Sequence, residues 1–140
     1  EKWVKEAMET GKLVMPTGRW YPFATYMKKG ELVWPRTKIL NYPVQGLGHD
    51  LMAIARVSFK RRLDAPKFKD IRNDVHLIST VHDSIVVDTR DESIGRVAEC
   101  LYGVFRDIPR NFERLFNVVF NLPMSVEISI GPNLHDLRDL

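Results

Sequence analysis

Three polar residues interrupt the most strand-like part of the sequence, the stretch STVHDSIVVD at positions 79–88. Apolar and polar residues alternate before them, and a β-branched run follows at 85–87. This pattern predicts a strand, a tight turn and a second strand. The turn then holds three side chains that can take part in chemistry: His82, Asp83 and Ser84.

Asp83 is a candidate metal ligand. Glycine or asparagine would form such a turn equally well, so an aspartate is not needed there for folding. Hard cations such as Mg²⁺ prefer oxygen ligands and take one or two protein carboxylates. The structural alternative is that Asp83 only caps the turn through its own backbone. A Ser-His-Asp triad is disfavoured, because neighbours in an extended strand point to alternating faces, whereas triads combine separated positions.

Histidine-aspartate doublets occur three times in the sequence, which suggests a second kind of metal-dependent enzyme. They are His49-Asp50, His82-Asp83 and His135-Asp136. HD-type metal phosphohydrolases also contain such doublets, but they carry them on helices. Here the second doublet lies in a strand-like stretch and the third follows Gly-Pro-Asn, which disfavours an all-helical scaffold. A phosphohydrolase is therefore the third alternative for the function.

Positive charge is concentrated in the first half of the chain, although the net charge is only +3. Residues 1–72 contain fifteen Lys or Arg and seven Asp or Glu, whereas residues 73–140 contain six and eleven. Much of the excess lies at 55–72, which suits contact with a polyanion. It also suits a solvated helix end whose cations interact with the helix dipole.

The basic-aromatic stretch that begins at Arg19 has two interpretations. Its aromatic residues can stack on nucleic acid, which would make the chain a non-catalytic nucleic-acid-binding domain. Alternatively, they pack on the core of their own hairpin.

Length and composition predict one domain over residues 1–140. The chain is 44% hydrophobic and 28% charged, which is ordinary for a globular protein. No apolar run is long enough to span a membrane and no leader peptide opens the chain, so we expect a cytoplasmic, non-secreted protein. Cys100 lies at helical spacing with Val97 and Leu101, which favours a core position over a nucleophile.

Local patterns predict the elements. Residues 1–11 read as the tail of a helix that began earlier and ends at Gly11. Then follow a hairpin at 12–23, a loop with a short strand at 27–35, and a helix from Pro43 to Arg62. After the hairpin at 75–89 come a helix at 94–105 with a capping box from Thr89 and Glu92, another helix at 112–121, and a half-buried strand at 124–131. The fold class is α+β, a small antiparallel sheet packed against helices.

Three strings in order, NYPVQGLGHDLM, TVHDSIVVD and SVEISIGPNLHDL, resemble the C-terminal palm of family A DNA polymerases, particularly phage-type members. The similarity runs from about Thr17 to Leu140, and TGRWYPF resembles the basic-aromatic hairpin that precedes this region in the family. Single-subunit RNA polymerases are relatives that share His-Asp-Ser. They lack the PVQG helix start, so DNA synthesis is favoured.

The resemblance implies roles for individual residues. Asp83 matches the palm aspartate that binds the two Mg²⁺ ions of nucleotidyl transfer, and His82 matches the histidine near the primer terminus. Asn41 and Gln45 match residues that contact the nascent duplex, the glutamine from the minor groove. There an amide donor can test base-pair geometry without reading sequence. A structural role is implied for Asp50. Sequence-independent phosphate contacts are expected from further cations: Arg19, Arg56, Lys60, Arg61 and Arg62.

Two departures from the family pattern limit what this chain is expected to do. Most members have Glu after the aspartate, where this sequence has Ser84. The family's first catalytic aspartate and its fingers helix have no counterpart in residues 1–40. We therefore expect a fragment that is inactive in isolation. Its partners would be primer-template DNA, a deoxynucleoside triphosphate and the remainder of the polymerase, with no membrane contact.

Overall fold

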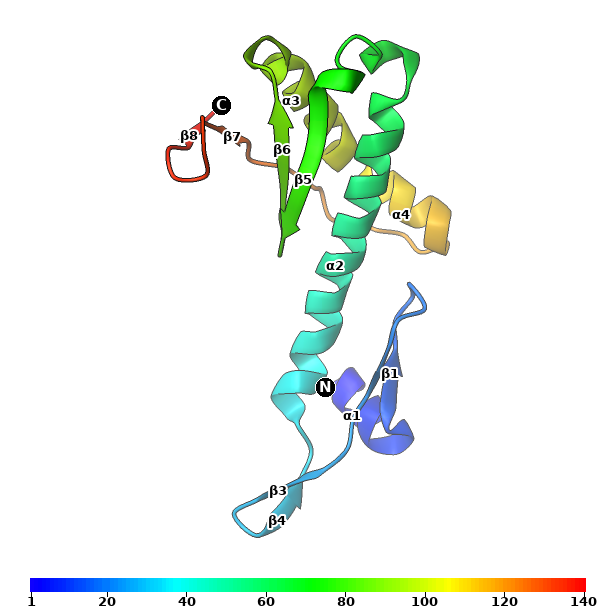
Figure 1. Ribbon diagram of the computed structural model, residues 1–140. Helices are drawn as coiled ribbons and strands as arrows, with labels where there is room; N and C mark the ends of the chain where they lie inside the picture. Colours follow the sequence, from blue (N-terminus) through cyan, green and yellow to red (C-terminus); the bar gives the residue numbers. More distant parts are fainter. The chain divides into compact units, whose positions relative to one another are not determined.

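A computed structural model describes residues 1–140 (Figure 1). The helices are α1 (Lys2–Thr10), α2 (Arg36–Leu63), α3 (Ile94–Arg106) and α4 (Ile108–Phe116). The strands are β1 (Lys12–Val14), β2 (Trp20–Pro22), β3 (Tyr26–Lys28), β4 (Glu31–Val33), β5 (Val75–Val81), β6 (Ser84–Thr89), β7 (Ser129–Ile130) and β8 (Arg138–Asp139). Short 3-10 helices lie at Pro66–Phe68, Arg72–Asp74 and Asp91–Ser93.

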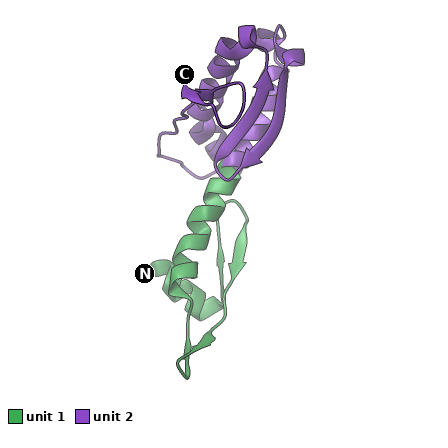
Figure 2. Cartoon of the chain, turned by 60° about the vertical axis from the view of Figure 1, so that its left-hand side comes forward, with its two compact units in different colours: residues 1–51 green, residues 52–140 purple.

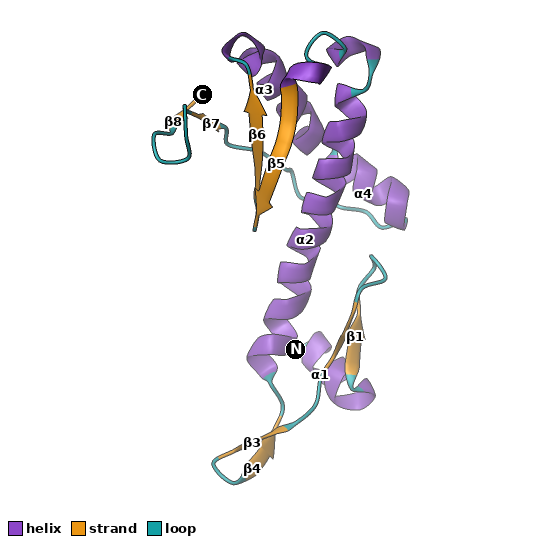
Figure 3. Cartoon of the chain, in the orientation of Figure 1, coloured by secondary structure: helices purple, strands orange, loops and turns teal.

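Helices and strands mix along the chain, as Figure 3 shows, which confirms the α+β class. The strands do not form one sheet. They form four separate antiparallel pairs, β1–β2, β3–β4, β5–β6 and β7–β8. Each pair joins strands that follow each other in sequence, so every pair is a local hairpin or loop closure.

The chain divides into two compact units, residues 1–51 and 52–140 (Figure 2). The boundary falls within α2. The expectation that residues 1–140 are one domain of a larger polymerase stays a prediction. None of the helices is long and apolar enough to cross a membrane.

Unit 1 is built around α1 and the β1–β2 hairpin. Gly11 ends α1 as predicted: its φ is 71° and its N–H donates to the carbonyl of Ala7 at 2.9 Å. The hairpin was also predicted correctly, and its register places Leu13 opposite Tyr21. One cluster of buried residues holds these elements to the start of α2: Val4, Ala7, Leu13, Phe23 and Ile39.

Helix α2 begins at Arg36, about two turns before the predicted start at Pro43. The prediction was based on Leu47, Leu51 and Ile54, which recur on one face of the helix. Here the N–H of Ile39 donates to the carbonyl of Pro35 at 3.0 Å, and the side chain of Ile39 is fully buried. Core packing therefore extends the helix in front of Pro43, which lies inside it and is buried. The stretch 27–35, predicted as a loop with a short strand, belongs to a complete hairpin, β3–β4, that begins at Tyr26.

Unit 2 contains the rest of α2, the β5–β6 hairpin, α3 and α4. Helix α3 agrees with the prediction, but the capping box is wrong: Thr89 ends β6, and its buried hydroxyl has no hydrogen-bond partner. Pro109 lies in the first turn of α4, which ends at Phe116 rather than at residue 121, because Asn117 is left-handed with φ 54°. The strand predicted at 124–131 is reduced to Ser129–Ile130, since only these residues pair with another strand.

Cys100 is fully buried in α3, as predicted for a core residue. Burial raises the pKa of its thiol to about 11. The thiol therefore stays protonated at neutral pH, which agrees with a core position.

Candidate functional site

The β5–β6 hairpin carries the candidate catalytic residues. Val81 pairs with Ser84, so only His82 and Asp83 form the loop. The register shifts between Leu77 and Ser79, which leaves one extra residue in β5 as a bulge. Bulges increase the local twist and are common beside active sites, where they redirect a strand end. The predicted strand, turn and strand are confirmed.

His82 occupies a costly backbone conformation. Its φ is 52°, in the left-handed region, whereas the φ of Asp83 is not positive. In two-residue loops of this kind, glycine is favoured at the first position, since a Cβ atom is strained there. A histidine in place of glycine is an outlier that points to a role outside folding.

The three side chains of the turn differ in what they contact. Ser84 is used locally, because its hydroxyl donates to the carbonyl of Val81 at 2.8 Å. Asp83 and His82 are exposed, and neither side chain forms a hydrogen bond or ion pair with the rest of the chain. The structure therefore contains no Ser-His-Asp triad at this turn.

Asp83 and Ser84 line a groove of about 520 Å³ that runs along β6 and α3. Its other wall is the segment 125–130, and ten of the sixteen residues that line the groove are apolar. Glu127 is the second carboxylate residue of this groove. Sequence reasoning missed Glu127, because the alternation in 124–131 assigned it to the solvent face of a strand. The chain contains no group of three or more residues that could hold a metal ion by themselves.

Asn41 and Gln45 lie one helical turn apart on α2, and both are exposed. His49, one turn further on, donates from Nδ1 to the main-chain carbonyl of Gln45 at 2.8 Å. This bond leaves the side-chain amide of Gln45 unused. The residue after it, Gly46, is buried, and a Cβ there would come within 1.5 Å of the Tyr21 hydroxyl.

Asp50 fixes the β1–β2 hairpin to α2. It accepts hydrogen bonds from the hydroxyl of Thr17 at 2.7 Å and from the guanidinium of Arg19 at 2.6 Å. Partial burial by itself raises the pKa of Asp50, but the bonds from Arg19 and Thr17 outweigh burial and hold that pKa below its usual value. Arg19, predicted to contact DNA, is thus paired inside the chain, and Asp50 has the structural partners expected of it.

The four α2 cations predicted to contact DNA phosphates also differ in whether an acidic residue of the chain already pairs with them. Arg62 pairs with Asp107 at 2.6 Å and also donates to the carbonyl of Gly103, and Lys60 pairs with Asp64 at 2.5 Å. Arg56 makes only a long bond of 3.4 Å to Thr80, and Arg61 is exposed without an ion pair. Of the four, Arg56 and Arg61 have charges that remain free for an external phosphate.

No protein-family model matches the chain. It is similar to DNA polymerase I of Chloroflexus aurantiacus, with 26% identity over 101 residues that cover 72% of this chain and 9% of that polymerase. It is also similar to DNA polymerase I of Aquifex aeolicus, with 33% identity over 86 residues that cover 56% of this chain and 14% of that polymerase. The chain thus spans about a tenth of the length of these curated relatives. These similarities support a function related to that of a DNA polymerase.

Proposed function

We propose that the chain is the C-terminal palm portion of a template-directed DNA polymerase of the family A, phage-like type. The observation that carries this proposal is the exposed Asp83, without any partner in the chain, beside a left-handed His82 at the tip of a hairpin. The similarity to two bacterial DNA polymerases I supports it.

Asp83 would bind Mg²⁺. Its carboxylate is exposed and lies at a groove, so it can supply one of the few protein ligands that Mg²⁺ uses. The bound metal would stabilise negative charge on the reacting oxygens of nucleotidyl transfer. A single carboxylate does not complete a two-metal site, so the other ligands would come from the remainder of the polymerase. Glu127, the other carboxylate residue that lines the groove, would assist Asp83.

The exposed α2 side chains would hold the primer-template duplex. Gln45 would donate from its free amide to the minor groove, where A·T and G·C pairs present acceptors at similar places. Asn41 extends the same row by one turn. Arg56 and Arg61 would contact phosphates, which adds affinity without sequence preference. We expect smaller contributions from Arg19, Lys60 and Arg62, because each already has an acidic partner.

A primer-extension assay tests this function. The isolated chain should not extend a primer with Mg²⁺ and deoxynucleoside triphosphates, because it lacks a second palm aspartate and a triphosphate clamp. Activity should appear once the portion of a DNA polymerase I that precedes the matched segment is supplied as a second chain. Strong incorporation by the isolated chain would overturn the fragment interpretation. Absence of activity in the completed enzyme, with both chains folded and associated, would overturn the polymerase assignment.

A non-catalytic nucleic-acid-binding domain is the second candidate. The free cations Arg56 and Arg61 favour it, because they can bind phosphate whether or not Asp83 holds a metal. If the chain is such a domain, its duplex binding should be sensitive to salt, should not require Mg²⁺ and should not weaken in Asp83→Ala. The completed enzyme should also stay inactive in primer extension. The HD-type phosphohydrolase receives no support. The His82-Asp83 doublet lies in a β-turn, and the His49-Asp50 doublet, although it lies on α2, is bound inside the chain, His49 to the carbonyl of Gln45 and Asp50 to Arg19.

A further inference from the structure

The β3–β4 hairpin of unit 1 exposes an apolar pair. Met27 lies directly opposite Leu32 in the register, so the two side chains share one face of the ribbon. Their exposed fractions are 63% and 67%, which means that nothing else in the chain covers them. In contrast, the β1–β2 hairpin of the same unit places Leu13 and Phe23 in the core.

At the tip of this hairpin, a lysine occupies a backbone conformation that glycine, asparagine or aspartate would adopt at a lower energetic cost. Lys28 pairs with Glu31, so the loop consists of Lys29 and Gly30, with φ values of 51° and 86°. Two positive φ values are the pattern of a type I′ turn, whose first position favours asparagine, aspartate or glycine. A side chain as long as lysine gains nothing from this backbone conformation. It places an ammonium group at the outermost point of the hairpin.

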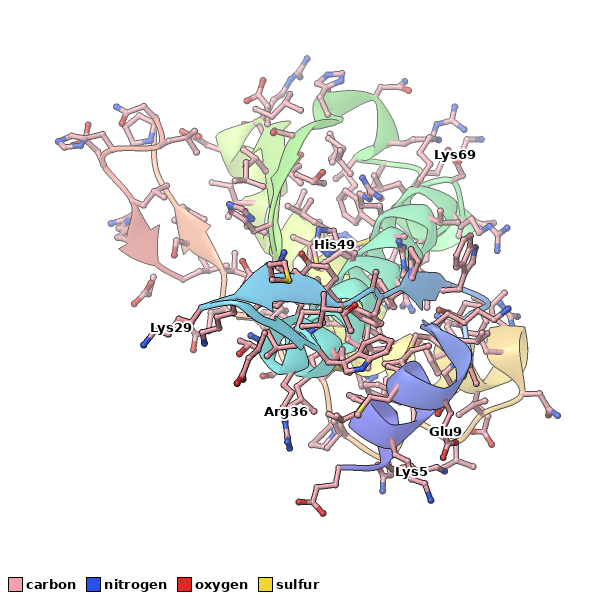
Figure 4. The ribbon with its side chains drawn as sticks, turned by 90° about the horizontal axis from the view of Figure 1, so that it is seen from below. Lys5, Glu9, Lys29, Arg36, His49 and Lys69 are labelled. Carbon is pink, nitrogen blue, oxygen red and sulfur yellow. The ribbon has the colours of Figure 1, made fainter.

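The hairpin and the residues after it carry uncompensated positive charge. Lys28 and Lys29 form no ion pair, and neither do Arg36 and Lys38 at the start of α2. Glu31 is the one acidic residue between positions 26 and 38. Figure 4 shows the side chains of Lys29 and Arg36 pointing outward from unit 1. The cations of unit 2 differ, because several of them, such as Arg62 and Lys67, are neutralised by acidic neighbours.

We propose that the β3–β4 hairpin is a contact site for double-stranded nucleic acid. Lys28 and Lys29 bind backbone phosphates, and the pair of Met27 and Leu32 covers the apolar sugar edges of a groove. A two-stranded β-ribbon has the right width to enter a major groove. The exposed pair is aliphatic rather than aromatic, so it offers no stacking platform for single-stranded bases. This proposal rests on the proposed function in one respect, because a polymerase fragment is expected to bind a nucleic-acid duplex. It adds a contact site that is distinct from α2.

Duplex binding by the 140-residue chain tests the site without Mg²⁺ or nucleotide. The probe is a fluorescein-labelled 20-base-pair duplex, titrated at several salt concentrations. The double variant Lys28→Gln/Lys29→Gln should bind roughly 3- to 10-fold more weakly and reduce the slope of log K against log salt by up to about 1.8, because two phosphate contacts are lost. The matched control, Lys2→Gln/Lys12→Gln, removes the same charge from two other exposed lysines of unit 1 that form no ion pair, and it should change affinity by less than about 2-fold.

A second variant separates the apolar contact from charge. Met27→Ser/Leu32→Ser should weaken duplex binding while leaving the salt slope unchanged. Equal effects of the two lysine double variants would overturn the proposal, because only net charge would then matter. If polyglutamate competes with the duplex at equal charge concentration, the proposal would also be overturned, and an acidic protein would be the favoured partner. Failure of the proposed function is seen separately, as absence of primer extension by the completed enzyme.

Discussion

The β1–β2 and β5–β6 hairpins both carry polar residues that could act on nucleic acid, but they use them differently. In β1–β2, Arg19 is bound to Asp50, and Tyr21 packs against the surface of Gly46. In β5–β6, the side chains of His82 and Asp83 form no hydrogen bond or ion pair with the rest of the chain. The polar side chains of the first hairpin therefore stabilise unit 1, whereas those of the second hairpin remain available to a ligand. The following variants test this contrast.

The largest effect is expected for Asp83→Ala in the completed enzyme. Loss of a metal ligand removes several kcal/mol of transition-state stabilisation, which corresponds to roughly 10³-fold in the rate of primer extension. The thermal midpoint should stay unchanged, since the exposed side chain forms no hydrogen bond or ion pair. Asp88→Ala is the control in the same hairpin, also exposed, and should retain activity. Ser84→Ala should cost much less than Asp83→Ala, and an equal loss from both would contradict the assignment of roles.

The first hairpin should respond in stability instead. Gly46→Ala places a methyl group against the Tyr21 hydroxyl and should destabilise unit 1 by about 1–3 kcal/mol through overpacking. Gly48→Ala, two residues further along α2, meets open space and should stabilise the helix by about 0.5–1 kcal/mol. All three tryptophans, Trp3, Trp20 and Trp34, lie in unit 1, so urea unfolding followed by their fluorescence measures this unit. Equal behaviour of the two variants would refute the docking of Tyr21.

His82→Gly should separate stability from function at the second hairpin. Removal of the left-handed strain should stabilise the fold by up to about 1 kcal/mol. Loss of the imidazole should lower primer extension by the completed enzyme about tenfold, the equivalent of one hydrogen bond. Asn117→Gly is the control, since Asn117 has φ 54° at the end of α4 and no proposed role. It should give the stability gain with full activity, and a His82→Gly enzyme of normal activity would remove the case for His82.

The hairpins could be predicted because their signals are local. Alternating apolar residues and turn residues close together in sequence specify β1–β2 and β5–β6, and Gly11 marks the end of α1 by its own backbone. The early start of α2 could not be predicted, because it depends on burial of Ile39 among residues distant in sequence. The same holds for the pairing of Arg19 and Arg62. The sequence alone does not distinguish a free basic residue from one that is bound to an aspartate 31 or 45 positions away.

The smallest expected effect concerns acid stability, and it tests whether Asp50 holds the first hairpin. Because the folded-state pKa of Asp50 is lowered, its ionised form stabilises the fold. That contribution is complete above the ordinary carboxyl pKa and disappears as the pH falls through the lowered value. Asp50→Asn should therefore unfold at lower urea concentration than the unaltered chain at pH 7. The difference between the two should shrink below about pH 4.

Thr17→Val provides the graded comparison, because it removes one of the bonds to Asp50 and keeps Arg19 in place. It should reduce the same acid-dependent stability by a smaller amount. A difference between Asp50→Asn and the unaltered chain that stays constant from pH 7 to pH 3 would mean that the carboxylate charge does not matter. The β1–β2 hairpin would then be held by Tyr21 and the apolar core alone. Arg19 would be as free as Arg61 to bind phosphate, and the contrast between the two hairpins would rest on His82 and Asp83 only.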